Sequence, residues 1–337
     1  MILRRDFPLI NRNFHYAFEN KLYHTLAFEN RARGWKLHKA AVDAGFTCPN
    51  IDGTCGTGGC TFCSGGSGYF TASPDTPIEE QIAREMARLR KKDENARAVA
   101  YFQAHTNTYA PVEVLRDRFE RALRCDGICG LSIATRPDAL PPKVLDYLAE
   151  LNQRTMLTVE LGLQTIHPRT AERIHRGYPP ETFLDAYKAL KIRGIRVCVH
   201  LINGLPGETQ EMMLESAAYL GQLRPDAVKL QMLHVIQGTP LESLYHEKKY
   251  RPMSLDAYVR LVCCQLELLP QETVIERLTG DGSKDTLVAP LWTRDKIRVL
   301  GSIDKTLAEW DSWQGRHFAD PRSRIVAFLN PKRVSRW

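Results

Sequence analysis

Six short runs rich in Val, Ile and Leu alternate with amphipathic helical patterns along the chain, and this alternation limits the fold more than any other feature. The runs, interpreted as strands, are 37–43, 97–103, 128–135, 156–163, 195–202 and 227–233. Strands that alternate with helices pair in parallel, because each helical crossover covers a face of the sheet. Six such units predict an α/β fold with a partial (β/α)6 barrel of the TIM type, and an open doubly wound sheet is the alternative. In both architectures the functional side chains lie at the carboxyl ends of the strands.

Proline and glycine mark the ends of the predicted helices. Pro77, Pro111 and Pro142 stand where a first helical residue is expected, because a helix leaves the amide of that position unbonded and proline has none. A further helix over 180–193 ends before Gly194. Together with a helix over 208–223, these segments supply the crossovers between the predicted strands.

The regular alternation weakens after residue 233. A helix over 254–269, a strand over 274–278 and a helix over 294–310 are predicted there, and the glycines of the tract 277–292 suit a lid. We therefore expect three parts, an N-terminal extension over 1–35, a barrel over 36–235, and a C-terminal extension over 236–337 that closes the barrel.

Composition narrows the class of protein. The 337 residues carry a formal net charge of +7, and 43% of them are hydrophobic. No stretch approaches the roughly 20 consecutive apolar residues that a membrane-spanning helix needs, and the N-terminus lacks the apolar core of a secretory signal. We expect a globular cytoplasmic protein that does not enter a membrane. The basic excess is compatible with a polyanion such as RNA, although such an excess is also common on solvated surfaces.

Four of the nine cysteines lie in one glycine-rich segment after the first predicted strand, TCPNIDGTCGTGGCTFC. Thiolates are soft ligands that suit zinc or iron–sulfur clusters. One interpretation is structural zinc held by Cys48, Cys55, Cys60 and Cys63. The other is an iron–sulfur cluster on three of them, which leaves one iron open for a cofactor or substrate. Only Cys60 and Cys63 form a C-x-x-C hook, and this spacing favours the cluster over a zinc site built from two hooks.

Four histidines, His105, His167, His200 and His234, lie near the ends of predicted strands. An imidazole in such a place can act as an acid, a base or a ligand. For each histidine taken alone, a packed or solvated ring is the more common situation, and the sequence leaves their roles open.

The cysteine segment and three later tracts resemble a known family. Cys48, Cys60 and Cys63, with Phe62 before the last of them, resemble the cluster-binding loop of radical S-adenosylmethionine (SAM) enzymes. Their spacing of eleven and then two intervening residues departs from that of most members and agrees with the YhcC/YtqA type. Three tracts are similar to that type and, more distantly, to the catalytic subunit of elongator: TRPD (135–138), ELGLQT (160–165) and GLPGET (204–209).

The resemblance implies a 4Fe-4S cluster on Cys48, Cys60 and Cys63, with SAM bound to the open iron. It also implies contacts to SAM or substrate from polar groups and a glycine at the strand ends, namely Gln103, Thr135, Arg136, Glu160, Gln164 and Gly204. Gln103 stands where many relatives have a glycine. A structural alternative for Glu160 is a buried carboxylate paired with Arg136 or Arg196, and the TRPD and GLPGET tracts can also be turns.

At the level of function, the resemblance to the YtqA/MnmL-like branch implies an enzyme that cleaves SAM reductively, so that a deoxyadenosyl radical takes a hydrogen atom from the substrate. The implied substrate is the wobble uridine of tRNA, whose carboxymethylaminomethyl group becomes aminomethyl. The implied partners are tRNA, an external electron donor such as flavodoxin or ferredoxin, and a methyltransferase. The alternative, from another class, is a non-catalytic zinc-stabilised RNA-binding protein in which Cys55 is the fourth ligand.

Overall fold

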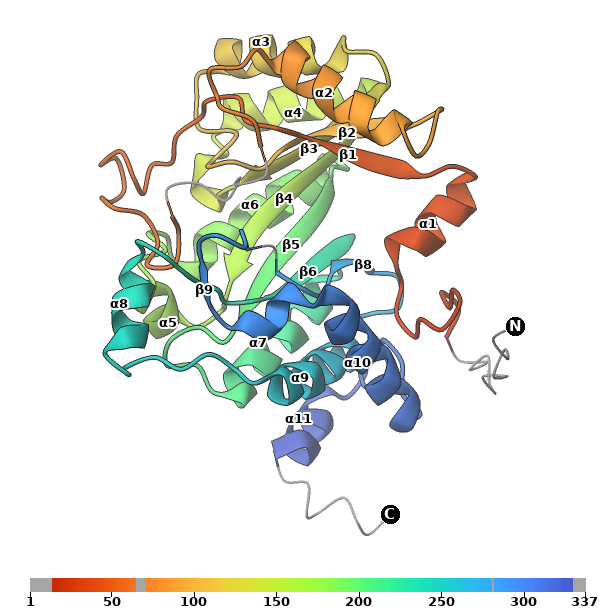
Figure 1. Ribbon diagram of the computed structural model, residues 1–337, viewed down its shortest axis with the longest axis vertical. Helices are drawn as coiled ribbons and strands as arrows, with labels where there is room; N and C mark the ends of the chain where they lie inside the picture. Colours follow the sequence, from red (N-terminus) through yellow and green to blue (C-terminus); the bar gives the residue numbers. More distant parts are fainter. Residues whose placement is uncertain (1–13, 65–70, 281, 330–337) are drawn as a thin grey trace.

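Seven parallel strands form one curled sheet, a half-barrel whose strands lie side by side in the order β1-β2-β3-β4-β5-β6-β8 (Figure 1). The computed structural model describes residues 14–64, 71–280 and 282–329. The strands are β1 (Leu37–Val42), β2 (Arg97–Phe102), β3 (Ile128–Thr135), β4 (Met156–Gln164), β5 (Arg196–Asn203), β6 (Ala227–Met232) and β8 (Val274–Arg277). The predicted six-unit parallel barrel is confirmed, and β8 adds a seventh strand beside β6.

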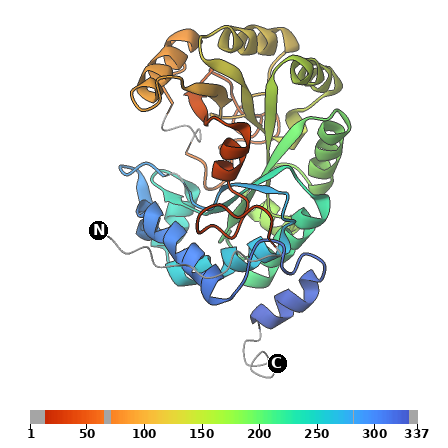
Figure 2. The same cartoon turned by 90° about the vertical axis from the view of Figure 1, so that its right-hand side faces the viewer.

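The crossover helices lie around the outside of the sheet (Figure 2). They are α2 (Ile78–Arg90), α3 (Val112–Leu123), α4 (Pro142–Arg154), α6 (Pro180–Ile192) and α7 (Gln210–Leu223). Pro142 is the first residue of α4, as predicted, whereas Pro77 and Pro111 each precede their helix by one residue in an extended conformation. The prediction was wrong by one residue there, because the fixed φ of proline suits both positions.

Further elements surround the two ends of the sheet. Before it lies α1 (Leu26–Arg33), and after β4 lies the short α5 (Pro168–Arg173). The later helices are α8 (Pro240–His246), α9 (Leu255–Leu268), α10 (Lys296–Glu309) and α11 (Pro321–Leu329), and the 3-10 turns are Pro137–Ala139 and Leu291–Arg294. A two-stranded antiparallel ribbon, β7 (Val235–Ile236) with β9 (Leu287–Ala289), connects the end of β6 to the segment after β8. The periodicity predicted α9, β8 and α10 but not α1, α5, α8, α11 or the ribbon.

The core lies between the sheet and its helices, and this arrangement fixes where the polar side chains go. In β4, Leu157, Val159, Leu161 and Leu163 belong to the main hydrophobic core. Because side chains alternate along a strand, Glu160 and the residues two apart from it face the inside of the half-barrel. The sheet therefore presents a hydrophobic outer face to the helices and a polar inner face to the barrel interior.

No helix in the described part of the chain is long and apolar enough to cross a membrane.

Candidate functional site

A cavity of about 330 Å³ opens at the carboxyl ends of the strands. Its walls come from the cysteine loop (residues 48–63), from the ends of β2 to β6, and from the segment between β8 and β9. A second groove, of about 540 Å³, lies between α2 and α3 and contains none of the predicted site residues. The first cavity is therefore the candidate site, and it lies where barrel enzymes carry their chemistry.

Three of the four clustered thiols line this cavity. Cys48, Cys60 and Cys63 are among its walls, whereas Cys55 is exposed, does not line it, and has its sulfur 3.8 Å from Asp138 Oδ2. Burial, together with the negative charge that Cys63 would add, raises the pKa of Cys60 to about 11. The structure therefore groups the three predicted cluster cysteines and separates the fourth ligand that the zinc alternative requires.

Within residues 14–64, 71–280 and 282–329, no three His, Cys, Asp or Glu side chains are arranged to hold a single metal ion. An iron–sulfur cubane does not need such an arrangement, because each thiolate binds a different iron. Three thiols around the wall of one cavity fit a cubane better than they fit a single zinc ion.

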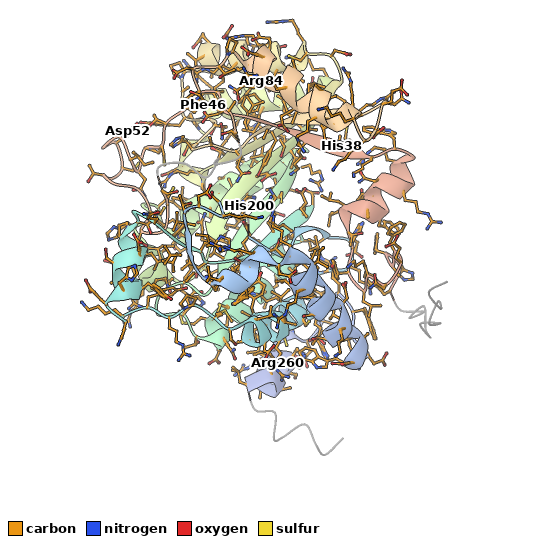
Figure 3. The ribbon with its side chains drawn as sticks, viewed as in Figure 1. His38, Phe46, Asp52, Arg84, His200 and Arg260 are labelled. Atoms are coloured by element: carbon orange, nitrogen blue, oxygen red, sulfur yellow. The ribbon has the colours of Figure 1, made fainter. Side chains whose placement is uncertain are left out.

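Asn50 fixes the shape of the cysteine loop. Its buried side-chain amide donates to the carbonyl of His175 at 2.6 Å and contacts Cys60 Sγ at 3.6 Å. Gly177 packs against it with φ +83°, and a Cβ there would lie 3.0 Å from Asn50 Oδ1. The loop after β1 is thus bound to the segment after α5, far away in the sequence. Figure 3 labels Asp52 of this loop at the edge of the molecule.

Two buried ring nitrogens in the cavity walls have no hydrogen-bond partner among the described residues. They are His105 Nδ1, after β2, and His234 Nε2, after β6. Burial and the charge of Lys296 lower the pKa of His234 to about 4, so that its ring is neutral at pH 7. A buried polar atom without a partner costs stability unless a ligand satisfies it. Both atoms are therefore suited to contact a bound cofactor or substrate.

Backbone strain accompanies these groups. His105 and Gln164 both line the cavity and both have left-handed backbone conformations, with φ of +61° and +60°. Residues other than glycine seldom adopt such angles, and they concentrate at functional sites. Gln164 ends β4 at a register shift, and its Oε1 accepts from the hydroxyl of Tyr178 at 2.9 Å.

Glu160 is the centre of a charged network at the floor of the cavity. It is 1% exposed, and its two oxygens accept hydrogen bonds from five side chains. The donors are Lys39 (2.8 Å), Ser132 (2.8 Å), Tyr101 (3.1 Å), His200 (2.9 Å) and Lys229. The alternative interpretation predicted a buried, paired carboxylate, but its proposed partners were wrong. Arg136 pairs with Asp138, and Arg196 pairs with Glu276.

The TRPD tract forms a turn and also contributes residues to the wall of the cavity. Thr135 and Arg136 line the cavity. Arg136 donates to both oxygens of Asp138, at 2.9 and 2.6 Å, and to the carbonyl of Arg176 at 2.8 Å. Arg136 therefore has two roles. Its guanidinium is hydrogen-bonded to the carbonyl of Arg176 and so positions that segment, and its side chain also lines the cavity.

Of the two remaining residues predicted to contact SAM or substrate, Gln103 and Gly204, one lines the cavity and the other does not. Gln103 lines the cavity at the end of β2. Gly204 does not line it, has φ +86°, and its carbonyl accepts from the Tyr250 hydroxyl at 2.9 Å. The positive φ shows that a tight turn after β5 accounts for this glycine.

Sequence analysis missed Arg176 and Tyr178, which line the cavity. Arg176 is 1% exposed and donates to the carbonyls of Leu163, Thr165 and Tyr178. No strand precedes these residues directly, and the only local signal is a charged residue beside Gly177 in an otherwise ordinary loop.

Residues of the tract 277–292, whose glycines suit a lid or a loop, line one side of the cavity. Arg277, Gly280 and Gly282 are among the cavity walls. A Cβ at Gly280 would lie 2.5 Å from the ring of His234, so that only glycine allows this close approach. The lid segment is thus packed directly on the unpartnered imidazole.

Comparisons with known proteins agree with this geometry. The model of the Radical SAM superfamily matches residues 51–220, and that of the Radical_SAM C-terminal domain matches residues 225–309. The chain is 47% identical to YtqA of Bacillus subtilis over 310 residues, covering 91% of this chain and 96% of YtqA. It is 36% identical to YhcC of Escherichia coli over 280 residues, covering 83% and 90% of the two chains.

More distant relatives share part of the chain or its fold. A tRNA uridine(34) acetyltransferase of Methanocaldococcus jannaschii is 30% identical over 161 residues, which are 47% of this chain and 29% of that enzyme. The solved structure of Methanocaldococcus infernus Elp3 superposes with a TM-score of 0.60 at 19% identity, covering 80% of this chain and 63% of that one. With a half-barrel, three thiols in its cavity and a superfamily match over half of its length, this chain belongs to the radical SAM superfamily, whose members use a 4Fe-4S cluster and SAM.

Proposed function

We propose that this radical SAM enzyme modifies the wobble uridine of tRNA, converting a carboxymethylaminomethyl group to an aminomethyl group. The observation that carries the chemical part is the separation of the four clustered thiols. Cys48, Cys60 and Cys63 share the cavity, and Cys55 lies outside it. Three cysteines would hold the cluster and leave one iron for SAM.

The residues around the thiols suit the two cofactors. When bound, cluster and SAM supply a one-electron cleavage whose radical takes a hydrogen atom from the substrate. The chain itself supplies binding groups. Thr135, Arg136 and Gln164 present polar atoms to the cavity, and His105 Nδ1 and His234 Nε2 have no protein partner among the described residues. We propose the first three, together with Gln103, as contacts to SAM or substrate.

The tRNA part of the proposal rests on the relatives and on charge. The name of the Methanocaldococcus jannaschii enzyme specifies uridine 34 of tRNA, and its similarity to this chain spans 161 residues. The net charge of +7 is compatible with an RNA partner. An external electron donor such as flavodoxin or ferredoxin would supply the electron, and a methyltransferase would act on the aminomethyl product.

The proposal is tested by comparing the nucleosides of tRNA from cells with and without this protein. We expect the carboxymethylaminomethyl uridine to accumulate in the deletion strain and the aminomethyl form, with its methylated derivative, to disappear. A strain that expresses Cys60→Ala should have the same profile as the deletion. An unchanged wobble-uridine profile would exclude the tRNA substrate and leave the radical SAM assignment intact.

A further inference from the structure

His200 is held through its Nε2 and lines the cavity with a partly exposed ring. It lies on the inner face of β5, and Figure 3 shows it near the middle of the molecule. Nε2 is 2.9 Å from Glu160 Oε2, and 19% of the side chain remains exposed where it lines the cavity. The carboxylate fixes the orientation of the ring, as carboxylates commonly do for functional histidines.

The surroundings decide which ring nitrogen carries the hydrogen. Burial alone would raise the pKa of Glu160, but Lys229 and Lys39 hold it well below the usual value, so that the group is a carboxylate. Burial and the charge of Lys229 lower the pKa of His200, so that its ring is neutral at pH 7. A carboxylate only accepts, and Nε2 must therefore donate, which leaves Nδ1 as a bare acceptor.

The charged and polar groups around His200 and Glu160 come from all the other strands of the sheet. They are Lys39 of β1, Tyr101 of β2, Ser132 of β3, Glu160 of β4, Lys229 of β6 and Arg277 of β8. Four of them donate to Glu160 alongside His200. The network thus holds the ring in place and leaves its Nδ1 edge for a ligand.

Gln231 lies two residue pairs further along the neighbouring strand, on the same face as Lys229. In the parallel register of β5 and β6, His200 pairs with Lys229 and Ile202 pairs with Gln231. Gln231 lines the cavity, and its carboxamide has no hydrogen-bond partner within the described residues. It therefore offers a donor and an acceptor to the same cavity that His200 lines.

We propose that His200 Nδ1 and the Gln231 carboxamide recognise the imide edge of a uracil base. In this arrangement, Nδ1 accepts from the N3–H of uracil and the Gln231 amide donates to the adjacent carbonyl oxygen. Cytosine has a bare N3, which would place two lone pairs against each other at His200. Unpaired bases in RNA are commonly read along this edge. The proposal rests on the proposed function and adds the residues that select the base.

Binding of anticodon stem-loop RNA to the cluster-reconstituted enzyme tests this assignment. The three probes have uridine, cytidine or N3-methyluridine at the wobble position and are otherwise identical. We expect the wild type to prefer uridine by at least about tenfold, the effect of one buried hydrogen bond. In His200→Gln an amide can still donate to Glu160, but its one acceptor, Oε1, lies one bond further from the backbone than Nδ1 does, so that it no longer stands where the ring nitrogen would meet N3–H, and the preference should fall below about twofold.

His246→Gln is the matched control, because this exposed histidine lies on α8 and does not line the cavity. It should keep the full preference. A His200→Gln enzyme that still prefers uridine as the wild type does would overturn the base-recognition proposal and leave the tRNA substrate in place. A wild type that binds none of the three RNAs would overturn both proposals.

The ring of the wild-type enzyme provides a second measurement that needs no variant. Nitrogen-15 NMR of the histidine side chains distinguishes a bare Nδ1 from a protonated one. We expect the His200 Nδ1 to be bare at pH 7 and to shift when the uridine probe is added. A hydrogen on Nδ1 in the free enzyme would overturn the proposal even if the variants fail to fold.

Discussion

At the scale of the residue, Glu160 has the largest influence on the site. Its carboxylate is buried beneath the cavity and accepts from five side chains on five different strands. It orients His200, neutralises Lys229 and Lys39, and joins strands that are far apart in the sequence. Glu160 contributes to the stability of the fold mainly through these charged partners, because removing the carboxylate would leave their buried positive charges without compensation.

Glu160→Gln should therefore destabilise the protein by about 3–5 kcal/mol, since Lys229 would remain buried without its counter-charge. The free energy of unfolding in urea measures this loss. Glu94→Gln, at an exposed position, is the control and should change it by no more than about 0.5 kcal/mol. An unchanged stability in Glu160→Gln would show that the network does not hold the barrel.

The same network predicts how stability depends on pH. Burial alone would raise the pKa of Glu276, but Lys39 and Arg196 lower it to about 2, and Lys229 and Lys39 likewise hold the pKa of Glu160 well below its usual value. The unfolded chain then binds more protons than the folded one, so that stability is complete above pH about 4.5 and falls as the pH approaches 2. The urea concentration at the midpoint of unfolding should therefore decrease between pH 7 and pH 3. In Glu160→Gln the midpoint should depend less on pH.

At the scale of the element, the cysteine loop and the lid segment both contribute to the walls of the cavity. Asn50 attaches the loop to the backbone of His175, and Gly280 brings the lid against His234. Each contact depends on one particular residue, a polar Asn50 or a small Gly280. Hydrophobic periodicity in the sequence carries no information about single residues of this kind.

The cysteine loop predicts different roles for its thiols. After anaerobic reconstitution we expect Cys55→Ala to retain about four irons per chain, because its sulfur lies beside Asp138 outside the cavity. Cys60→Ala should lose the cluster. Iron content and the absorption of the cluster measure both. Loss of metal in Cys55→Ala, with zinc in the wild type, would support the four-cysteine site instead.

The lid predicts a steric effect. Gly280→Ala would place a Cβ 2.5 Å from Cε1 of His234 and 3.0 Å from Met232 Sδ, so that the ring or the lid must shift. We expect SAM cleavage to fall at least about tenfold, because small displacements in a site have large effects on rate. Gly301→Ala in α10 is the control, since no atom lies within 4 Å of its added Cβ. Equal rates for the two variants would contradict the role of this contact.

At the scale of the whole molecule, the half-barrel brings distant residues to one cavity. Strand β8 lies after the predicted barrel boundary at 235, yet it pairs with β6 and supplies Glu276 to the interior. We keep the division at 235 as a proposal about domains. The sheet itself continues across that boundary.

Periodicity along the chain was enough to predict the parallel barrel sheet and most strand bounds, and the resemblance to a known cluster-binding loop was enough to predict the three thiols of the cavity. Both signals are local, because a hydrophobic period and a cysteine motif each extend over a short stretch of sequence. The partners of Glu160, the presence of His200 and Gln231 in one cavity, and the contacts of Arg176 could be seen only in the folded chain. Lys39, Glu160 and Lys229 lie on three separate strands, and they meet only because the sheet curls and turns its alternate side chains inward. The alternation of residues along a strand predicts which side chains face inward. The curvature of the sheet determines which side chains of other strands they contact.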